Sequence, residues 1–226
     1  ILFLLIAFIH TNNAILTENP QYWQDIYSGQ RWIVVPDISL WPRYLHNVIG
    51  AIAVAGLWCA GIGRYQLHFH AKKRDAVGHW MVKMGLHWAV AATTFEILIG
   101  FVYLFSIGMD KVKAFMGNGI LFVGWSISLV TAFVALVCMV MAMMKPENAK
   151  LMWSSVGLIV VTLVGMTMGR LLQRMISLEN FVQELTVRPS NSSLILFLAT
   201  FVLGLLVLGY LIRLVWTLPE KPESAE

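Results

Sequence analysis

The stretch GILFVGWSISLVTAFVALVCMVMAMM, residues 119–144, decides the fold class of this chain. It contains no Asp, Glu, Lys, Arg or His, and it is longer than the ~20 apolar residues that a helix needs to cross a bilayer. A transmembrane β-strand would alternate polar and apolar residues over a shorter segment, and this run does not. The sequence therefore predicts a membrane-spanning helix here.

Similar apolar runs recur along the chain and predict its architecture. Because every backbone amide inside a bilayer must be satisfied internally, continuous runs of this length are expected as helices. The predicted fold is all-α: an integral membrane helical bundle with five full transmembrane helices plus a truncated N-terminal one. Residues 1–226 are expected to form a single membrane-embedded domain, with no soluble domain. The apolar runs are Ile1–Ile9, Tyr44–Ile62, Leu86–Ile107, Gly119–Met144, Leu151–Leu172 and Leu194–Trp216.

The composition excludes several classes of protein. Of the 226 residues, 58% are hydrophobic and 12% are charged, about half the ~25% charged fraction of a soluble domain. The formal net charge of +4 is small enough to come from loop residues that set membrane orientation, so no nucleic acid partner is implied. Cys59 and Cys138 both fall within apolar runs, which predicts neither a disulfide nor a zinc site. No hydrolase or nucleotide-binding motif occurs.

The Lys and Arg residues of the short loops predict the orientation. The densest group lies in the loop Arg64–Arg74, which we expect on the cytoplasmic side of a bacterial inner membrane, together with the C-terminus. The loop Thr11–Arg43 then belongs to the outer side. It carries aromatic residues of the kind that lie at headgroup depth, namely Trp23, Tyr27, Trp32 and Trp41.

The histidines are the first candidates for chemistry, because ionisable groups inside membrane spans are costly and mark functional sites. His46 begins its span and is followed by Gly and Ala residues, which let a flat macrocycle or a neighbouring helix approach closely. We predict that His46 ligates a haem iron; a hydrogen-bonded helix contact is the alternative. His87 begins the next span and is another candidate ligand. His68, His70 and His79 lie among basic residues and are expected at the surface.

Depth in the bilayer restricts which side chains can share one iron. His46 lies near the outer end of its helix and His87 near the inner end of the next, so these two are not expected as a pair. At the level of His46 the candidate second ligands are His10, at the outer end of the first run, and Met116, just before the fourth.

Two further ionisable residues are candidates. Arg170 follows two methionines near the outer end of its run, where it is expected either to pair with a haem propionate or to reach the headgroups. Glu96 is the only acid well inside a span. A carboxylate there suits proton transfer, and a hydrogen bond to Thr93 or a purely structural role are the alternatives.

These features resemble the later half of cytochrome bd ubiquinol oxidase subunit I and the bd-like membrane b-type cytochromes. The resemblance covers most of the chain. An Asn-containing turn before a Pro is similar to residues 12–20, and a helix that begins with a haem-ligating His is similar to Tyr44–Ala51. A basic hairpin is similar to Gly63–Arg74, and the Glu-x-Gly-Arg stretch of the family is similar to Thr167–Arg170.

The resemblance implies that His46 ligates a low-spin b haem on the outer side, with Met116, shortly after Lys113, as the second axial ligand. At two places the chain departs from the family. Only Gly108–Gly117 stands where the family has its long quinol-binding loop, and Thr167 stands where it has the carboxylate that serves the high-spin haem. That quinol site and that route of oxygen reduction are therefore not carried over.

The predicted function is a membrane-bound b-haem electron-transfer subunit that exchanges electrons between the quinone pool and a partner redox subunit. One or two b haems and a quinone are the expected cofactors, and the other subunits of a respiratory complex are the expected partners within the lipid bilayer. One alternative is a quinol:oxygen oxidase fragment whose catalytic haems lie on other helices. Another is a haem-free anchor in which His46 and Glu96 form a proton or ion path, although no inverted repeat or broken helix of the transporter kind supports it.

Overall fold

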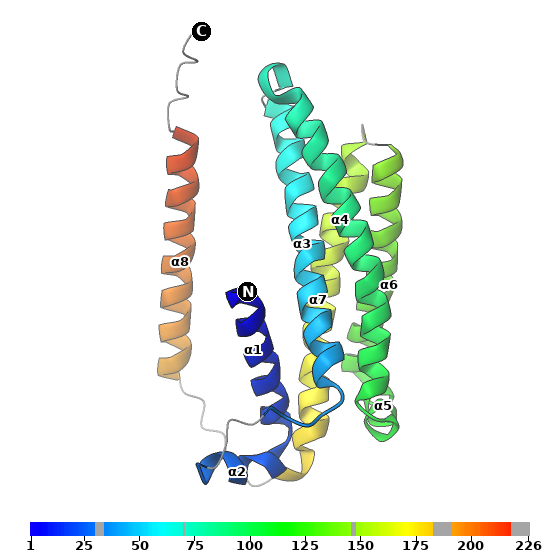
Figure 1. Ribbon diagram of the computed structural model, residues 1–226, viewed down its shortest axis with the longest axis vertical. Coiled ribbons are helices and arrows are strands. Elements are labelled where there is room, and N and C mark those ends of the chain that lie inside the picture. The colour runs from blue at the N-terminus through cyan, green and yellow to red at the C-terminus, as the bar shows by residue number, and fades with distance from the viewer. Residues whose placement is uncertain (30–33, 70, 146–147, 183–190, 218–226) are drawn as a thin grey trace. The chain divides into compact units, whose positions relative to one another are not determined.

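The computed structural model describes residues 1–29, 34–69, 71–145, 148–182 and 191–217. Over these residues the chain is helical and no strand occurs. Five of the described helices are long and apolar enough to cross a membrane. The fold is therefore an all-α membrane helical bundle, as the apolar runs predict (Figure 1).

The helices extend beyond most of the apolar runs that predicted them. Polar residues outside the hydrocarbon can continue the intrahelical hydrogen bonds, so a change in polarity marks the edge of the membrane rather than the end of a helix. The elements are α1 (Leu2–Glu18), η1 (Pro20–Tyr22), α2 (Trp23–Tyr27), α3 (Leu40–Phe69), α4 (Ala71–Ser106), α5 (Met109–Met116), α6 (Gly119–Met144), α7 (Ala149–Val182) and α8 (Asn191–Thr217).

Two predicted loops are wrong for this reason. The first part of Thr11–Arg43 continues α1 as far as Glu18 and then forms η1 and α2. The expected loop Arg64–Arg74 instead completes α3 and begins α4. Residue 70, between these helices, lies outside the described residues, as do Trp32 and the C-terminal tail.

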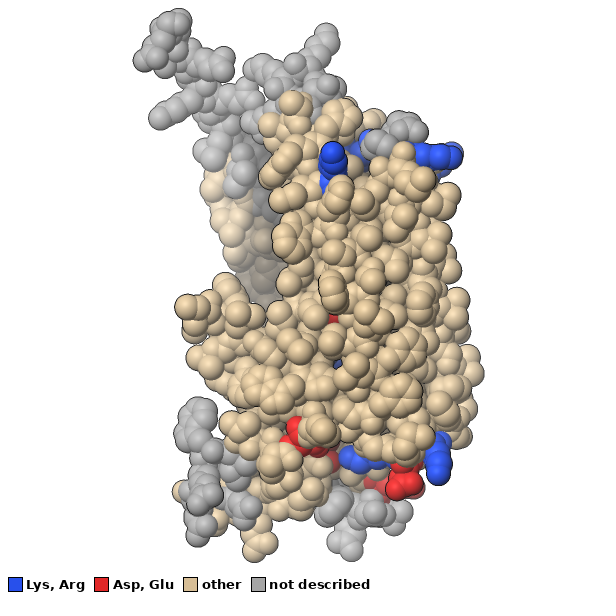
Figure 2. Space-filling model, turned by 45° about the vertical axis from the view of Figure 1, so that its right-hand side comes forward, with Lys and Arg blue, Asp and Glu red and all other residues tan. Residues whose placement is uncertain are grey.

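The chain divides into two compact units, Ile1–Gln183 and Glu184–Glu226. In the second unit the described part is α8, which is apolar along most of its length. In the first unit, charged side chains gather at the two ends of the helices on the face shown in Figure 2, and the broad belt between them shows only small traces of charge. This distribution suits a bundle that crosses a bilayer.

The first unit is built from two antiparallel hairpins, α3 with α4 and α6 with α7 (Figure 1). The backbones of α3 and α4 nearly touch, because a Cβ on Gly56 would lie 2.7 Å from both the amide nitrogen of Ala89 and the carbonyl oxygen of Gly85. Close approach at small residues is a common way for helices to associate in membranes. Part of the small-residue stretch after His46 thus serves a neighbouring helix.

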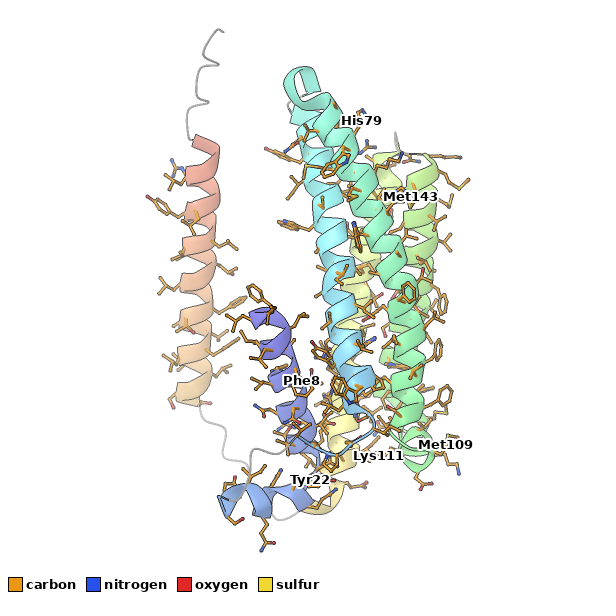
Figure 3. All side chains as sticks on the ribbon, in the orientation of Figure 1. Phe8, Tyr22, His79, Met109, Lys111 and Met143 are labelled. Atoms are coloured by element: carbon orange, nitrogen blue, oxygen red, sulfur yellow. The ribbon has the colours of Figure 1, made fainter. Side chains whose placement is uncertain are left out.

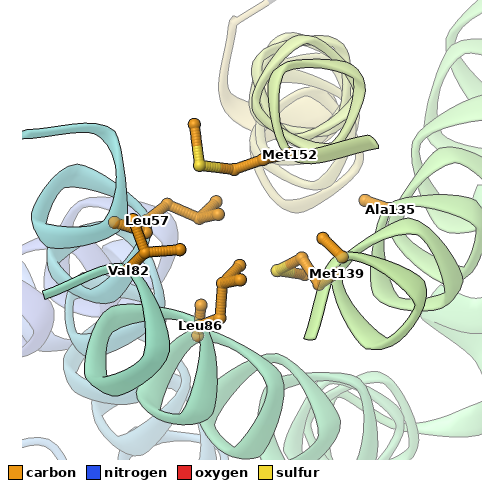
Figure 4. Close-up of a cluster of buried hydrophobic side chains, with 9 residues drawn as sticks. Leu57, Val82, Leu86, Ala135, Met139 and Met152 are labelled. Atoms are coloured by element: carbon orange, nitrogen blue, oxygen red, sulfur yellow. The ribbon is translucent and has the colours of Figure 1, made fainter. Parts of the chain in front are cut away.

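Apolar side chains join the two hairpins in the half of the bundle nearer the α3–α4 connection. Leu57, Val82, Leu86, Met139 and Met152 are all buried there and come from four different helices (Figure 4). The opposite end, where α5 lies, is called the α5 end below; Met109 and Lys111 mark it in Figure 3, far from His79. Polar residues replace the apolar core as the helices approach the α5 end.

Candidate functional site

A cavity of about 160 Å³ lies inside the first unit, between α3, α4, α6 and α7. Cavities of ~150 Å³ bind a single benzene ring, whereas pockets for drug-sized ligands are larger, ~300–1,000 Å³. The walls are largely apolar, but ten polar side chains also line them. These are Arg43, His46, Asn47, Thr93, Glu96, Tyr103, Ser128, Thr162, Arg170 and Gln173.

His46 of α3 and Glu96 of α4 meet at this cavity. The Nδ1 atom of His46 lies 3.1 Å from Oε1 of Glu96, and the two side chains are 16% and 13% exposed. A carboxylate at this distance can fix the imidazole tautomer or stabilise the charged ring. The leading interpretation of the sequence gave the two residues different tasks, and one alternative joined them in a proton or ion path; the structure places them in contact.

Three buried atoms at this pair have no hydrogen-bond partner among the described residues, namely Nδ1 of His46, Oε2 of Glu96 and Oγ1 of Thr93. The approach of Nδ1 to Oε1 is therefore a close contact and not a formed hydrogen bond. Glu96 and Thr93 are three positions apart and lie on one face of α4. The hydrogen bond between them, one of the alternatives for Glu96, is not formed, because Oγ1 of Thr93 has no partner. Because a buried unsatisfied polar group costs about 1–3 kcal/mol, the two oxygens call for water or another polar group in the cavity.

A buried ion pair lies next to the cavity, towards the α5 end. Arg43 donates from Nη1 and Nη2 to the two carboxylate oxygens of Glu18, at 2.9 Å each. Gln173 donates to Oε2 of the same carboxylate at 3.1 Å, and the hydroxyl of Tyr103 donates to Gln173 at 2.6 Å. Charges that leave water need such partners. The network therefore fixes α1, α3, α4 and α7 to one another.

Arg170 forms a second link, which joins α7, α3 and α1. Its guanidinium donates to Oδ1 of Asn47 at 2.6 Å, and Nδ2 of Asn47 donates to Thr11 at 3.2 Å. Arg170 lines the cavity and is also exposed. Its contact is thus with the residue next to His46.

The other predicted ligands do not line the cavity. Met116 is 55% exposed at the end of α5, while its neighbour Phe115 is buried and does line the cavity. His87 and His10 are exposed, and Nδ1 of His87 lies 2.7 Å from the carbonyl oxygen of Lys83. Lys113, expected beside a ligating Met116, is exposed as well.

These positions bear on the b haem that the sequence predicts. The cavity provides one imidazole, His46, and neither of the proposed second ligands. Within the described part of the chain, no three His, Cys, Asp or Glu residues form a group that could hold a metal ion. A space for one six-membered ring does not hold four linked pyrrole rings, so the cavity does not fit a b haem as the helices stand.

The sequence did not single out Glu18, Arg43, Tyr103 or Gln173. Arg43 looked like an ordinary loop charge at the end of a span, and Glu18 lay in an expected loop. Both become buried because α1 continues to Glu18 and packs on α3. The sequence does show that several predicted spans have a polar residue near one end. It does not show which of these residues form hydrogen bonds or ion pairs with one another.

No family model, curated protein or solved structure matches this chain.

Proposed function

We propose that this chain is the membrane subunit of a quinone-linked oxidoreductase, and that His46 and Glu96 handle the protons that accompany electron transfer. The observation that carries the proposal is the 3.1 Å approach of Nδ1 to Oε1 at a partly open cavity lined mainly by α3, α4, α6 and α7. Ionisable groups within a membrane span are costly and mostly functional. A pair of them beside free space is suited to gain and lose protons.

The pair has a simple proton chemistry. With one proton between them, the two side chains are either an imidazolium and a carboxylate or a neutral imidazole and a carboxylic acid, and the net charge is zero in both cases. Exchange between these forms therefore moves no net charge into the apolar surroundings, where an isolated charge is expensive. The unpartnered oxygens of Glu96 and Thr93 give water a place to deliver or remove the proton.

A quinone headgroup is the redox partner that the cavity supports best. Its single six-membered ring suits about 160 Å³ of space with largely apolar walls. Oxidation of a quinol releases two electrons and two protons. The His46–Glu96 pair, which already holds one proton, would accept the two quinol protons one after the other and release the first to water before it takes the second, and the electrons would pass to a partner redox subunit of the complex.

A b haem is the second candidate cofactor, because the Nε2 atom of His46 is available to ligate an iron. With Nδ1 facing Glu96, no hydrogen bond reaches Nε2 from the described residues, and a carboxylate on the other nitrogen is usual for a metal-ligating histidine. Arg170 lines the same cavity and would suit a propionate. A bound haem would supply one-electron transfer, but the helices would have to separate and a second ligand would have to come from elsewhere.

The orientation proposed with this function follows the positive-inside rule. The α3–α4 connection carries the densest group of Lys and Arg residues, so it faces the cytoplasm of a bacterial cell. The α5 end then faces outward, and the cavity lies nearer the outer surface.

Quinol oxidation in membrane vesicles that contain the chain tests the proposal, with a short-chain quinol as donor and ferricyanide as acceptor. Loss of a positioned acid or base typically costs 10²–10⁴-fold, so Glu96→Gln should lower the rate at least about 100-fold. Glu179→Gln is the matched control, because Glu179 is exposed on α7. Equal rates in the two variants would refute the proposal.

A difference spectrum, reduced minus oxidised, decides between the two cofactors. A b-type absorption that disappears in His46→Ala and persists in His79→Ala would establish the haem. No such absorption in a protein that oxidises quinol would exclude the haem and leave the proton-handling pair.

A further inference from the structure

Two glycines form the hollows in which His46 and Glu96 lie. A Cβ on Gly50 would be 2.8 Å from Oε1 and 3.3 Å from Cδ of Glu96. A Cβ on Gly100 would be 3.3 Å from Cε1 and 3.6 Å from Nδ1 of His46. Each glycine thus faces the ionisable side chain of the opposite helix.

The spacing of these residues is reciprocal. His46 and Gly50 are four residues apart on α3, and Glu96 and Gly100 are four residues apart on α4. Residues at this spacing lie one above the other on the same helix face. Because α3 and α4 run antiparallel, His46 comes opposite Gly100 and Gly50 comes opposite Glu96. At each of these two positions, a large polar side chain of one helix therefore packs against a glycine of the other helix.

Other glycines of the same interface have a different task. At Gly56 and Gly85 the nearest atoms are backbone atoms of the partner helix, at 2.7 and 2.5 Å, so these two residues set the distance between the helices. At Gly50 and Gly100 the nearest atoms belong to side chains. A methyl group there would displace a side chain while the helices keep their spacing.

We propose that Gly50 and Gly100 are positioning residues for the His46–Glu96 pair, which hold Nδ1 and Oε1 at contact distance by leaving both side chains room. A methyl group on Gly50 meets Oε1 closer than real Cβ contacts allow, so the carboxylate must move away. A methyl group on Gly100 is less disruptive, since the imidazole has to yield by only a few tenths of an ångström. The effect of alanine is therefore graded, larger at Gly50 than at Gly100.

The inference rests on the proposed function only for its effect on activity, so it is tested first by a spectroscopic signature. The probe is the ¹⁵N NMR spectrum of the histidine rings in the full chain, reconstituted in lipid nanodiscs. His46→Ala assigns the resonances, and Glu96→Gln gives the spectrum of an unpaired His46.

Gly50→Ala should shift the His46 resonances most of the way towards those of Glu96→Gln, and Gly100→Ala should shift them part of the way. Gly61→Ala is the matched control on α3, because its Cβ would meet nothing closer than the Trp153 ring at 4.0 Å. It should leave the spectrum unchanged. If Gly50→Ala does not fold, Gly100→Ala decides the question.

Two outcomes separate this inference from the proposed function. Wild-type resonances in folded Gly50→Ala and Gly100→Ala proteins would overturn the positioning role. Shifted resonances with an unchanged rate of quinol oxidation would retain it and refute the proposed function. If both proposals hold, Gly50→Ala should lower the rate about 100-fold, the cost of displacing a catalytic group by ~1 Å.

Discussion

Replacing Glu18 by Gln is the sharpest test of the buried network that holds α1. The change keeps the size of the side chain and removes its charge, so the guanidinium of Arg43 loses both of its 2.9 Å charged contacts. The Arg43 and Glu18 side chains are only 8% and 9% exposed, so water does not replace the lost partner. Removing one member of a buried ion pair typically costs about 3–5 kcal/mol.

The expected loss of stability is measurable by thermal unfolding of the purified protein in detergent. For a chain of this size, 1 kcal/mol corresponds to about 2–4 °C, so the midpoint should fall by about 6–20 °C. The control is the double variant Glu18→Leu with Arg43→Met, which removes both charges together. Apolar replacement of a whole buried pair is often neutral, so this double variant should unfold close to the wild type.

The unfolding midpoints of the single and double variants together show whether the charge of Glu18 stabilises the protein. A Glu18→Gln protein that unfolds within 2 °C of the wild type would refute the reasoning, because it would mean that Arg43 is hydrated or finds another partner. A double variant as unstable as the single one would show that the packing of Glu18, and not its charge, holds α1.

Three further predictions follow from the positions of single side chains. In a protein without native cysteines, a Cys at position 79 should react with an impermeant maleimide only in permeabilised cells, and a Cys at position 113 in intact cells; the reverse would invert the proposed orientation. Met116→Ala should leave quinol oxidation and any redox spectrum unchanged, because the Met116 side chain is exposed. Phe115→Ala enlarges the cavity and should weaken the binding of a short-chain quinone, as measured by equilibrium dialysis. Gly56→Ala forces apart two touching backbones and should cost about 1–3 kcal/mol, seen as a lower unfolding midpoint; an unchanged midpoint would show that the α3–α4 contact is looser.

The number and type of the spanning helices could be predicted because the bilayer permits only a few kinds of backbone structure. Every backbone amide in the hydrocarbon needs an internal partner, so each long apolar run was expected to be a helix, and the described part of the chain contains five such helices. Helix ends could not be predicted in this way. The sequence becomes polar after Gly63, and polar residues permit both a helix and a loop at the edge of a membrane; here α3 continues to Phe69.

The candidate site could be predicted residue by residue but not as an arrangement. His46 and Glu96 stood out because ionisable residues inside spans are rare. Their contact depends on the alignment of α3 with α4, which close backbone packing around Gly56 determines. The sequence also did not show which face of α5 points to the cavity. Successive residues of a helix point about 100° apart, so Phe115 lines the cavity and Met116 faces away from it.

The Glu18–Arg43 ion pair also has a consequence for biogenesis. On the scale of translocon-mediated insertion, an arginine near the centre of a spanning segment costs about 2.5–3.5 kcal/mol, and the cost falls as the residue nears the interface. The glutamate that neutralises Arg43 arrives earlier in synthesis, at the end of α1. Glu18 is therefore synthesised before Arg43. When α3 enters the membrane, α1 is already present, and Arg43 can form its ion pair with Glu18 as α3 inserts.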